Sequence, residues 1–213
     1  YDALRNRVWI EPMLLGRYPQ DAIEDLAAFG ELPVQDGDLA RIAQPFDWLG
    51  INYSNDDHVR AEPGGSWLAT PGMRDAVPFA PDGEHTDMGW PITPDGLRAL
   101  MVGLKERYPD LPPIYITENG VAYDDPLVEG AVHDMRRISY LDAHIRAMHA
   151  ALEEGVDVRG YFEWSLMDNF EWSHGYHKRF GIVHVDYDTL ERTPKDSAYW
   201  YREVIARNGL EAR

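Results

Sequence analysis

Three short apolar runs that alternate with amphipathic segments constrain the fold of this 213-residue chain more than any other feature. The runs cover residues 46–53, 114–117 and 158–166 and show little polar alternation, which is typical of strands buried on both faces. Apolar residues recur at helical spacing between them, at 93–108 and 133–154. This order predicts parallel strands joined by right-handed helical crossovers.

The remaining segments predict shorter elements and two long loops. Helices are expected at 19–29 and 36–43, and Thr193-Pro194 is expected to begin a last helix that closes at Gly209. Residues 54–92 are rich in Pro, Gly, Asp and Ser without a sustained period, and a loop of that length is uncommon unless it is functional or disordered. The aromatic-rich loop 168–177 is expected to end in a short strand pair around 180–187.

The predicted architecture is α/β and belongs to part of a barrel. Long loops follow the carboxyl ends of the strands, where α/β barrels carry their active sites. Three main strands cannot close an eight-stranded barrel, and a three-stranded parallel sheet leaves unprotected edges. The chain also begins at Tyr1 rather than at an initiator Met. We therefore expect a piece of a longer protein.

The charge and the residues that are absent exclude several classes of function. The chain has 20 basic and 37 acidic residues and a formal net charge of -17, which opposes binding to nucleic acids and to anionic membranes. It has no cysteine, so a thiol nucleophile and a disulfide framework are excluded. The histidine spacing fits no metal site, and no glycine-rich phosphate loop is present, so we expect neither metal nor cofactor. Without cysteine we favour the bacterial cytoplasm over secretion, although the charge fits both.

Glu118 is the first candidate for chemistry. It closes the strand Ile114–Thr117 and precedes an Asn-Gly turn. A carboxylate at the mouth of a buried strand is held rigidly, and attack on a sugar carbon requires such placement. The alternative is a helix cap or a solvated turn residue, and position alone does not separate the two.

The segment 164–172 is the second candidate, because two Trp residues flank a Glu and an Asn in one polar loop. A ring for stacking beside an acid for hydroxyl groups favours a sugar subsite, and a protein–protein hot spot is the alternative. Glu163 should face the opposite side from Trp164 and pair with a basic group there. Asp47 and Asp168 remain candidates for a second acid, because hydrolysis by two carboxylates needs one.

Two segments resemble the glycoside hydrolase family 1 β-glucosidases. IYITENG at 114–120 is similar to the nucleophile motif of that family, and GYFEWSLMDNFEW at 160–172 is similar to its sugar-binding segment. The stretches at 46–53, 88–90 and 175–187 also match, and all five stretches occur in the same order as in the family. The resemblance implies that residues 1–213 are the C-terminal half of a single (β/α)8 catalytic domain, with barrel strands six to eight. The acid/base glutamate of the family lies in an Asn-Glu-Pro motif that this sequence lacks, so the N-terminal half is an expected partner.

The resemblance also implies a role for each matched residue. Glu118 would be the nucleophile that forms the glycosyl-enzyme. The others would hold the substrate, namely Asn52 at the 2-hydroxyl, Trp164 beneath the non-reducing sugar, Glu171 and Trp172 at the 4- and 6-hydroxyls, Phe180 beside the 6-position and Trp90 on the leaving-group side. Ser54 stands where the family usually has a tyrosine bonded to the nucleophile, which puts the level of activity in question.

The implied function is a retaining β-glycosidase, with β-glucosidase favoured and β-glucosides or cello-oligosaccharides as substrates. Glu171 would repel the phosphate of a 6-phosphosugar, which favours a neutral sugar. Glucose, galactose and fucose all remain candidates. The alternatives are a catalytically inactive fragment that binds carbohydrate or a partner, and a transglycosidase with the same covalent intermediate.

Overall fold

The computed structural model describes residues 1–64 and 75–211. They fall into two compact units. One joins Tyr1–Asp47 to Asp57–Pro81, and the other joins Trp48–Asp56 to Asp82–Arg213. The second, larger unit contains the main sheet, the candidate nucleophile and the candidate sugar-binding residues, whereas Asp47 belongs to the smaller unit.

The smaller unit is mainly helical and carries one hairpin. Its two predicted helices are confirmed but are shorter than expected. The first helical segment was not predicted, because Pro12 lies inside it and interrupts the usual helical signals. The elements are a π-helical turn Ala3–Arg7 (η1), α1 (Val8–Leu15), α2 (Gln20–Leu26), a 3-10 turn Ala27–Phe29 (η2), α3 (Asp38–Ile42) and the antiparallel strands β2 (Val59–Ala61) and β3 (Ala76–Pro78).

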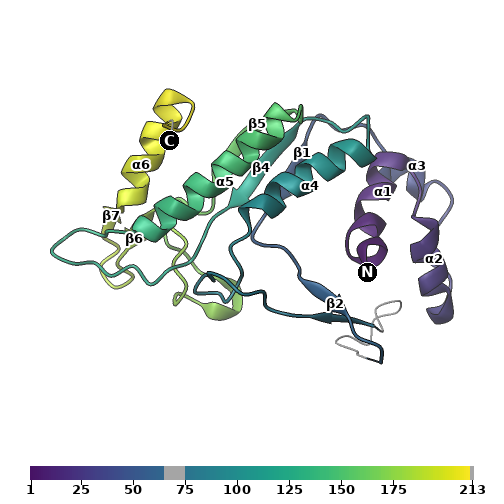
Figure 1. The fold of residues 1–213 in the computed structure, drawn as a ribbon, viewed down its shortest axis with the longest axis horizontal. Helices are drawn as coiled ribbons and strands as arrows, with labels where there is room; N and C mark the ends of the chain where they lie inside the picture. The colour runs from purple at the N-terminus through teal and green to yellow at the C-terminus, as the bar shows by residue number, and fades with distance from the viewer. Residues whose placement is uncertain (65–74, 212–213) are drawn as a thin grey trace. The chain divides into compact units, whose positions relative to one another are not determined.

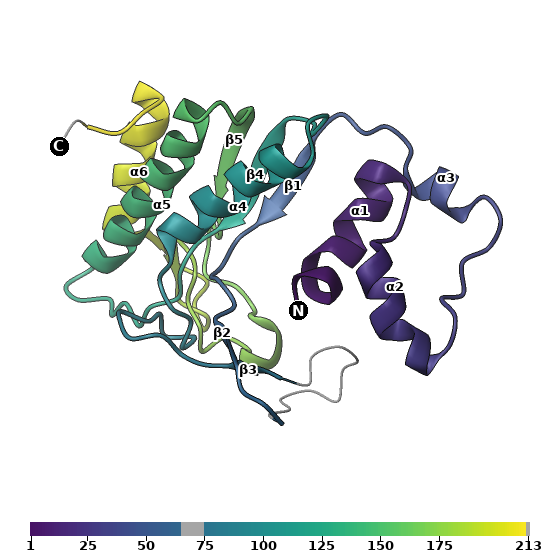
Figure 2. The same cartoon turned by 45° about the vertical axis from the view of Figure 1, so that its right-hand side comes forward.

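The larger unit is built on the predicted parallel sheet (Figure 1). The strand order is β1–β4–β5, and both pairings are parallel. Two long helices lie along one face of this sheet in both views (Figure 2). The elements are β1 (Leu49–Asn52), α4 (Pro94–Arg107), β4 (Ile114–Asn119), α5 (Met135–Glu153) and β5 (Val158–Glu163).

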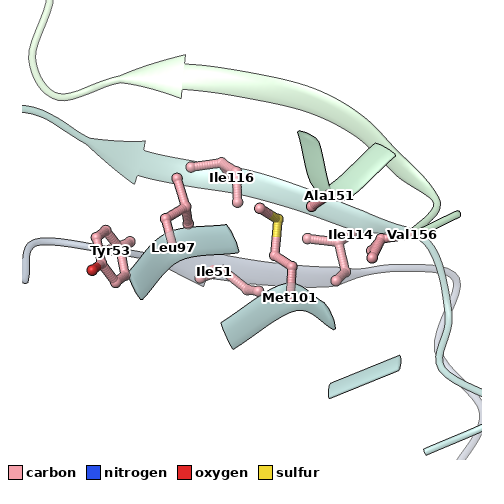
Figure 3. Packing of buried hydrophobic residues seen from close by; sticks show 8 residues of the cluster. All are labelled: Ile51, Tyr53, Leu97, Met101, Ile114, Ile116, Ala151 and Val156. Carbon is pink, nitrogen blue, oxygen red and sulfur yellow. The ribbon is translucent and has the colours of Figure 1, made fainter. Parts of the chain in front are cut away.

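The hydrophobic core lies between the sheet and the two helices. Leu97 and Met101 of α4 pack on Ile51 of β1 and on Ile114 and Ile116 of β4 (Figure 3). These side chains recur at intervals of two along the strands and of four along the helix, so each element presents one apolar face to this layer. The helices thereby fix the sheet on which the candidate site stands.

The opposite face of the sheet is largely uncovered within the larger unit. Tyr115 meets the ring of Trp48 edge-on, with a centroid distance of 5.3 Å. Trp48 is 51% exposed and Phe162 on β5 is 56% exposed. The expectation of strands buried on both faces is therefore not met within the described residues of the larger unit, where helices cover one face of the sheet only. We call the face with Trp48, Tyr115, Thr117 and Phe162 the uncovered face.

The last helix begins later than predicted. Thr193 and Pro194 belong to β7 (Arg192–Pro194), which pairs with β6 (Val183–Val185), and α6 spans Asp196–Arg207. The first turn of α6 is capped from outside, because the Ser197 amide donates to Asp134 Oδ1 at 2.8 Å. A cap supplied by a distant segment leaves no local sequence signal. In residues 1–64 and 75–211, no helix is both long and apolar enough to cross a membrane.

Candidate functional site

A bulge at the end of β4 directs Glu118 away from the helices. Ile116 lies in the core, and Asn119 bonds to Tyr140 of α5, so both face the helical layer. Regular alternation would place residues 116 and 119 on opposite faces. The pairing with β5 shifts register between them, which accommodates one extra residue. Thr117 and the half-buried Glu118 consequently turn toward the uncovered face.

Asn52 lies at the neighbouring strand end. It is opposite Glu118 in the parallel β1–β4 pairing, and its Oδ1 accepts a hydrogen bond from the Thr117 hydroxyl at 2.7 Å. The carboxyl ends of parallel strands meet at one edge of a sheet, which is why residues 66 positions apart become neighbours here. The structure therefore brings these two predicted site residues together.

Trp164 follows β5 and lies directly beside the end of β4. Its amide donates to the Asn119 carbonyl at 3.0 Å. Gly120 allows the close approach, because a Cβ added there would lie 1.6 Å from the Trp164 carbonyl oxygen. The peptide bond between Trp164 and Ser165 is cis. The predicted platform and the predicted nucleophile thus belong to adjoining strand ends.

Substitution of Gly120 by alanine should destabilise the chain, because the new methyl group would overlap a backbone atom that cannot swing aside. We expect a loss of about 1–3 kcal/mol in the free energy of unfolding, measured by urea titration. Gly103 is the matched control, since it is exposed on α4 with nothing within 4 Å of an added Cβ. Gly103→Ala should raise stability by about 1 kcal/mol. Equal effects of the two substitutions would contradict the close contact at Trp164.

Glu171 lies close enough to Glu118 for the two charges to interact. Burial raises the pKa of Glu171, proximity to His174 lowers it, and the negative charge of Glu118 raises it further. The Glu171 amide donates to the Gly175 carbonyl at 2.7 Å, which closes the loop around it. The two candidate carboxylates therefore share one region of the larger unit. Trp172, the next residue, is 82% exposed and turns its ring to solvent.

Phe180 and Trp90 lie side by side, and Phe180 is hydrogen-bonded to the segment that follows β5. Their ring centroids are 6.2 Å apart. Phe180 is buried, and its carbonyl accepts a hydrogen bond from the Ser165 amide at 3.3 Å, next to Trp164. The structure thus links Trp90, which lies before α4, to the segment that follows β5.

Neither sequence candidate for a second acid is suited to that role. The Asp168 side chain is fully buried and accepts hydrogen bonds from Arg179 at 2.6 Å and from the Gly181 amide at 3.0 Å. Its carboxylate is thereby engaged in holding the loop. Asp47 precedes β1 at the amino end of the strand, whereas Glu118 lies near the carboxyl end of the parallel strand β4. Both residues are excluded as the partner acid.

Glu163 faces the helical layer as predicted, but the predicted basic partner is wrong. Neither carboxylate oxygen is hydrogen-bonded within the part of the chain that the structure describes, and both are buried. Burial raises the pKa of Glu163 well above its ordinary value, the charges of Arg137 and Lys195 lower it, and those of Asp134 and Asp168 raise it. The protonated form is therefore favoured in the folded chain.

Glu163→Gln should stabilise the chain at neutral pH, because a neutral amide needs no proton uptake on folding. The native state holds a proton that the unfolded state releases above a pH of about 4.3, so the stability of the wild type falls by up to about 1.4 kcal/mol per pH unit there. Urea unfolding of both proteins should show an advantage for the variant that grows above pH 5 and vanishes below pH 4. A pH-independent difference would contradict the raised pKa.

Two fully buried cations support the loops of the site and were missed by the sequence analysis. Arg137 pairs with Asp134 at 2.9 Å and with Asp125, and it donates to the carbonyls of Val121 and Phe180. Lys195 lies 3.0 Å from Asp125 and 3.4 Å from Asp168, and burial lowers its pKa. The sequence held one signal that Arg137 is buried. It lies four residues before the apolar Leu141, so the two side chains share one face of α5.

Comparison with known proteins identifies the family. The glycosyl hydrolase family 1 model matches residues 1–210. The thermostable β-glucosidase B of Thermobispora bispora is 47% identical over 98% of this chain and 43% of the relative. A bifunctional β-D-glucosidase/β-D-fucosidase of Bifidobacterium breve is 46% identical over 96% of this chain and 47% of the relative.

The fold agrees with solved structures. A psychrophilic β-glucosidase from Micrococcus antarcticus superposes with a TM-score of 0.90 at 43% identity, over 98% of this chain and 48% of that protein. The chain thus spans less than half the length of the relatives it matches. Its sheet and helices correspond to a part of their α/β barrel. The chain belongs to glycosyl hydrolase family 1.

Proposed function

We propose that this chain supplies the nucleophile and the sugar site of a retaining β-glycosidase, and that it forms strands six to eight of the barrel. The observation that carries the proposal is the position of Glu118. It is the next-to-last residue of the central strand β4, it lies opposite Asn52, and its charge acts on Glu171. A carboxylate held at a strand end beside hydroxyl-binding groups and an indole ring suits attack on an anomeric carbon.

The proposed reaction proceeds in two displacements. The Glu118 carboxylate attacks the anomeric carbon, and the bond to the leaving-group oxygen breaks while that oxygen takes a proton from an acid. Water then attacks the anomeric carbon of the glycosyl-enzyme and gives a proton to the acid, which was deprotonated in the first step. The bond to Glu118 breaks, and the carboxylate is released. Glu171 and Trp172 would bind the distal hydroxyl groups, Asn52 the 2-hydroxyl, and Trp164 would stack beneath the ring. Trp90, held against Phe180, would lie on the leaving-group side.

The acid that protonates the leaving group is expected on the other half of the barrel. The sequence has no Asn-Glu-Pro motif, and Asp47 and Asp168 are excluded. The uncovered face, with Trp48 and Phe162 exposed, is the surface that the other half would cover. We call the assembly of this chain with that amino-terminal half the complete barrel. Turnover is a property that we assign to the complete barrel.

A neutral β-linked glucose at the non-reducing end is the proposed substrate, and cello-oligosaccharides are the proposed natural form. The names of the relatives, a β-glucosidase and a β-D-glucosidase/β-D-fucosidase, support this class. An ionised Glu171 next to Glu118 would oppose a 6-phosphate, which carries close to two negative charges. Glucosides should therefore be cleaved in preference to their 6-phosphates.

Covalent labelling tests the proposal. A 2,4-dinitrophenyl 2-deoxy-2-fluoro-β-glucoside needs no acid to expel its leaving group, so labelling depends on the nucleophile and the sugar site. We expect one label per complete barrel, with the peptide that carries Glu118 increased by the mass of a fluoroglucosyl group. Saturable binding without an adduct would favour an inactive carbohydrate-binding protein. If added alcohol led to formation of a new glycoside of that alcohol and no free sugar were released, the result would favour a transglycosidase.

A further inference from the structure

The side chain of Asn119 joins the ends of all three parallel strands directly beneath Glu118. It is 1% exposed. Its Nδ2 donates to the Tyr53 carbonyl just beyond β1 at 3.0 Å and to the Tyr140 hydroxyl oxygen of α5 at 3.1 Å. Its Oδ1 accepts a hydrogen bond from the Tyr161 hydroxyl of β5 at 2.6 Å. Both amide hydrogens and the amide oxygen are therefore engaged.

At the end of the β1–β4 pairing, the Asn119 side chain takes the place of a backbone hydrogen-bond donor. The Tyr53 amide donates to the Glu118 carbonyl at 2.8 Å, as in a regular ladder. The Tyr53 carbonyl is then satisfied by the Asn119 side chain. The Asn119 main-chain carbonyl is meanwhile bonded to Trp164 on the β5 side. The register shifts between Ile51 and Asn52 and between Ile116 and Asn119 both occur here.

We infer that Asn119 is a positioning residue for Glu118, an inference that rests on the proposed function of Glu118 as the nucleophile. By holding its own side chain in the helical layer, Asn119 keeps the bulge in place, and the bulge leaves Glu118 on the uncovered face beside Asn52. Without the amide, β4 can relax toward regular alternation and rotate the carboxylate. A displacement of about 1 Å at a reacting group lowers the rate about 100-fold.

The partners of Asn119 hold it without adding charge. Burial raises the pKa of both Tyr140 and Tyr161, so both hydroxyl groups keep their protons. Tyr140 also donates to the Ser54 carbonyl at 3.4 Å. An asparagine, which offers two donors and an acceptor on a short stem, matches this set of one carbonyl and two hydroxyl groups.

The test measures the chemical step apart from binding, in the complete barrel. For each variant we would determine the second-order rate of labelling at Glu118 by the dinitrophenyl fluoroglucoside, and the dissociation constant for glucose. Asn119→Ala should label about 100-fold more slowly, and Tyr161→Phe, which removes one donor, about 10-fold more slowly. Glucose binding should change by less than about threefold in both variants, because the sugar-binding side chains are retained.

Ser197→Ala is the matched control. Ser197 is equally buried, and its hydroxyl donates to Asp134 at 2.5 Å, at the N-cap of α5 rather than at the strand ends that Asn119 joins. Its labelling rate should equal that of the wild type. An equal fall in Ser197→Ala would overturn the inference, since any buried polar defect would then suffice.

The outcomes separate this inference from the proposed function. A wild type that is not labelled at Glu118 contradicts the proposed function itself. A labelled wild type together with Asn119→Ala labelled at the same rate overturns the positioning role alone. If Asn119→Ala does not accumulate as folded protein, Tyr161→Phe decides. Slower labelling with unchanged glucose affinity supports the inference, and an unchanged rate overturns it.

Discussion

Glu118→Gln in the complete barrel is expected to lower kcat on a β-glucoside by a factor on the order of 10⁵, because an amide cannot form the glycosyl ester. The amide has nearly the shape of the carboxylate, so the Tyr53 bond to the residue 118 carbonyl and the bulge should persist. Glucose binding should therefore change little. Steady-state kinetics with an aryl β-glucoside, together with glucose titration, measures both quantities.

Glu163→Gln is the control for that experiment, because it makes the same chemical change at a carboxylate that faces the helical layer. Glu163 is the last residue of β5 and lies opposite Asn119 in the β4–β5 pairing. Its carboxylate oxygens are buried and the protonated form is favoured. The amide should therefore leave kcat within about threefold of the wild type, on the order of what a remote substitution does. Comparable losses in the two variants would remove Glu118 from the reaction.

Arg137→Met is expected to lower the free energy of unfolding by about 3–5 kcal/mol, because it leaves Asp125 and Asp134 buried without their shared cation. The carbonyls of Val121 and Phe180 lose a donor in the same step. Thermal and urea unfolding should both report this loss, at about 2–4 °C per kcal/mol for a chain of this size.

Arg136→Met is the matched substitution at the next position. Arg136 is exposed, pairs with Glu84 at 3.1 Å and lies over the Tyr123 ring. An exposed ion pair with such a contact contributes about 1 kcal/mol, so the effect should be several times smaller. If the two arginines proved equivalent, the buried charges could not be what holds the loops of the site.

Most of the secondary structure could be predicted from the sequence. The parallel strands and the helices between them follow from apolar periodicity, and their positions agree with β1, β4, β5, α4 and α5. The boundaries differ where the determining contact is remote. Thr93 is at the N-cap of α4 as expected, yet its hydroxyl accepts from the Asp56 amide at 3.1 Å rather than from its own helix.

The candidate site could be predicted only as a set of residues. Glu118 and Trp164 were chosen because strand ends and aromatic loops can carry chemistry, and the structure places them on adjoining strand ends. The acid candidate Asp168 and the partner expected for Glu163 were wrong. Both errors have one cause. A local sequence pattern predicts toward which side of the sheet a side chain points, but it does not predict which charged groups pack against that side chain.

The sequence by itself determined which segments form strands and helices and which residues end the strands. These properties depend on the side-chain periods of 2 and 3.6, which neighbouring residues set. Only the tertiary structure decided that β4 bulges before Asn119, that Arg137 and Lys195 are buried among carboxylates, and that Glu163 has no hydrogen-bond partner within residues 1–64 and 75–211. These features depend on groups brought together from distant parts of the chain, whose contacts no local pattern records.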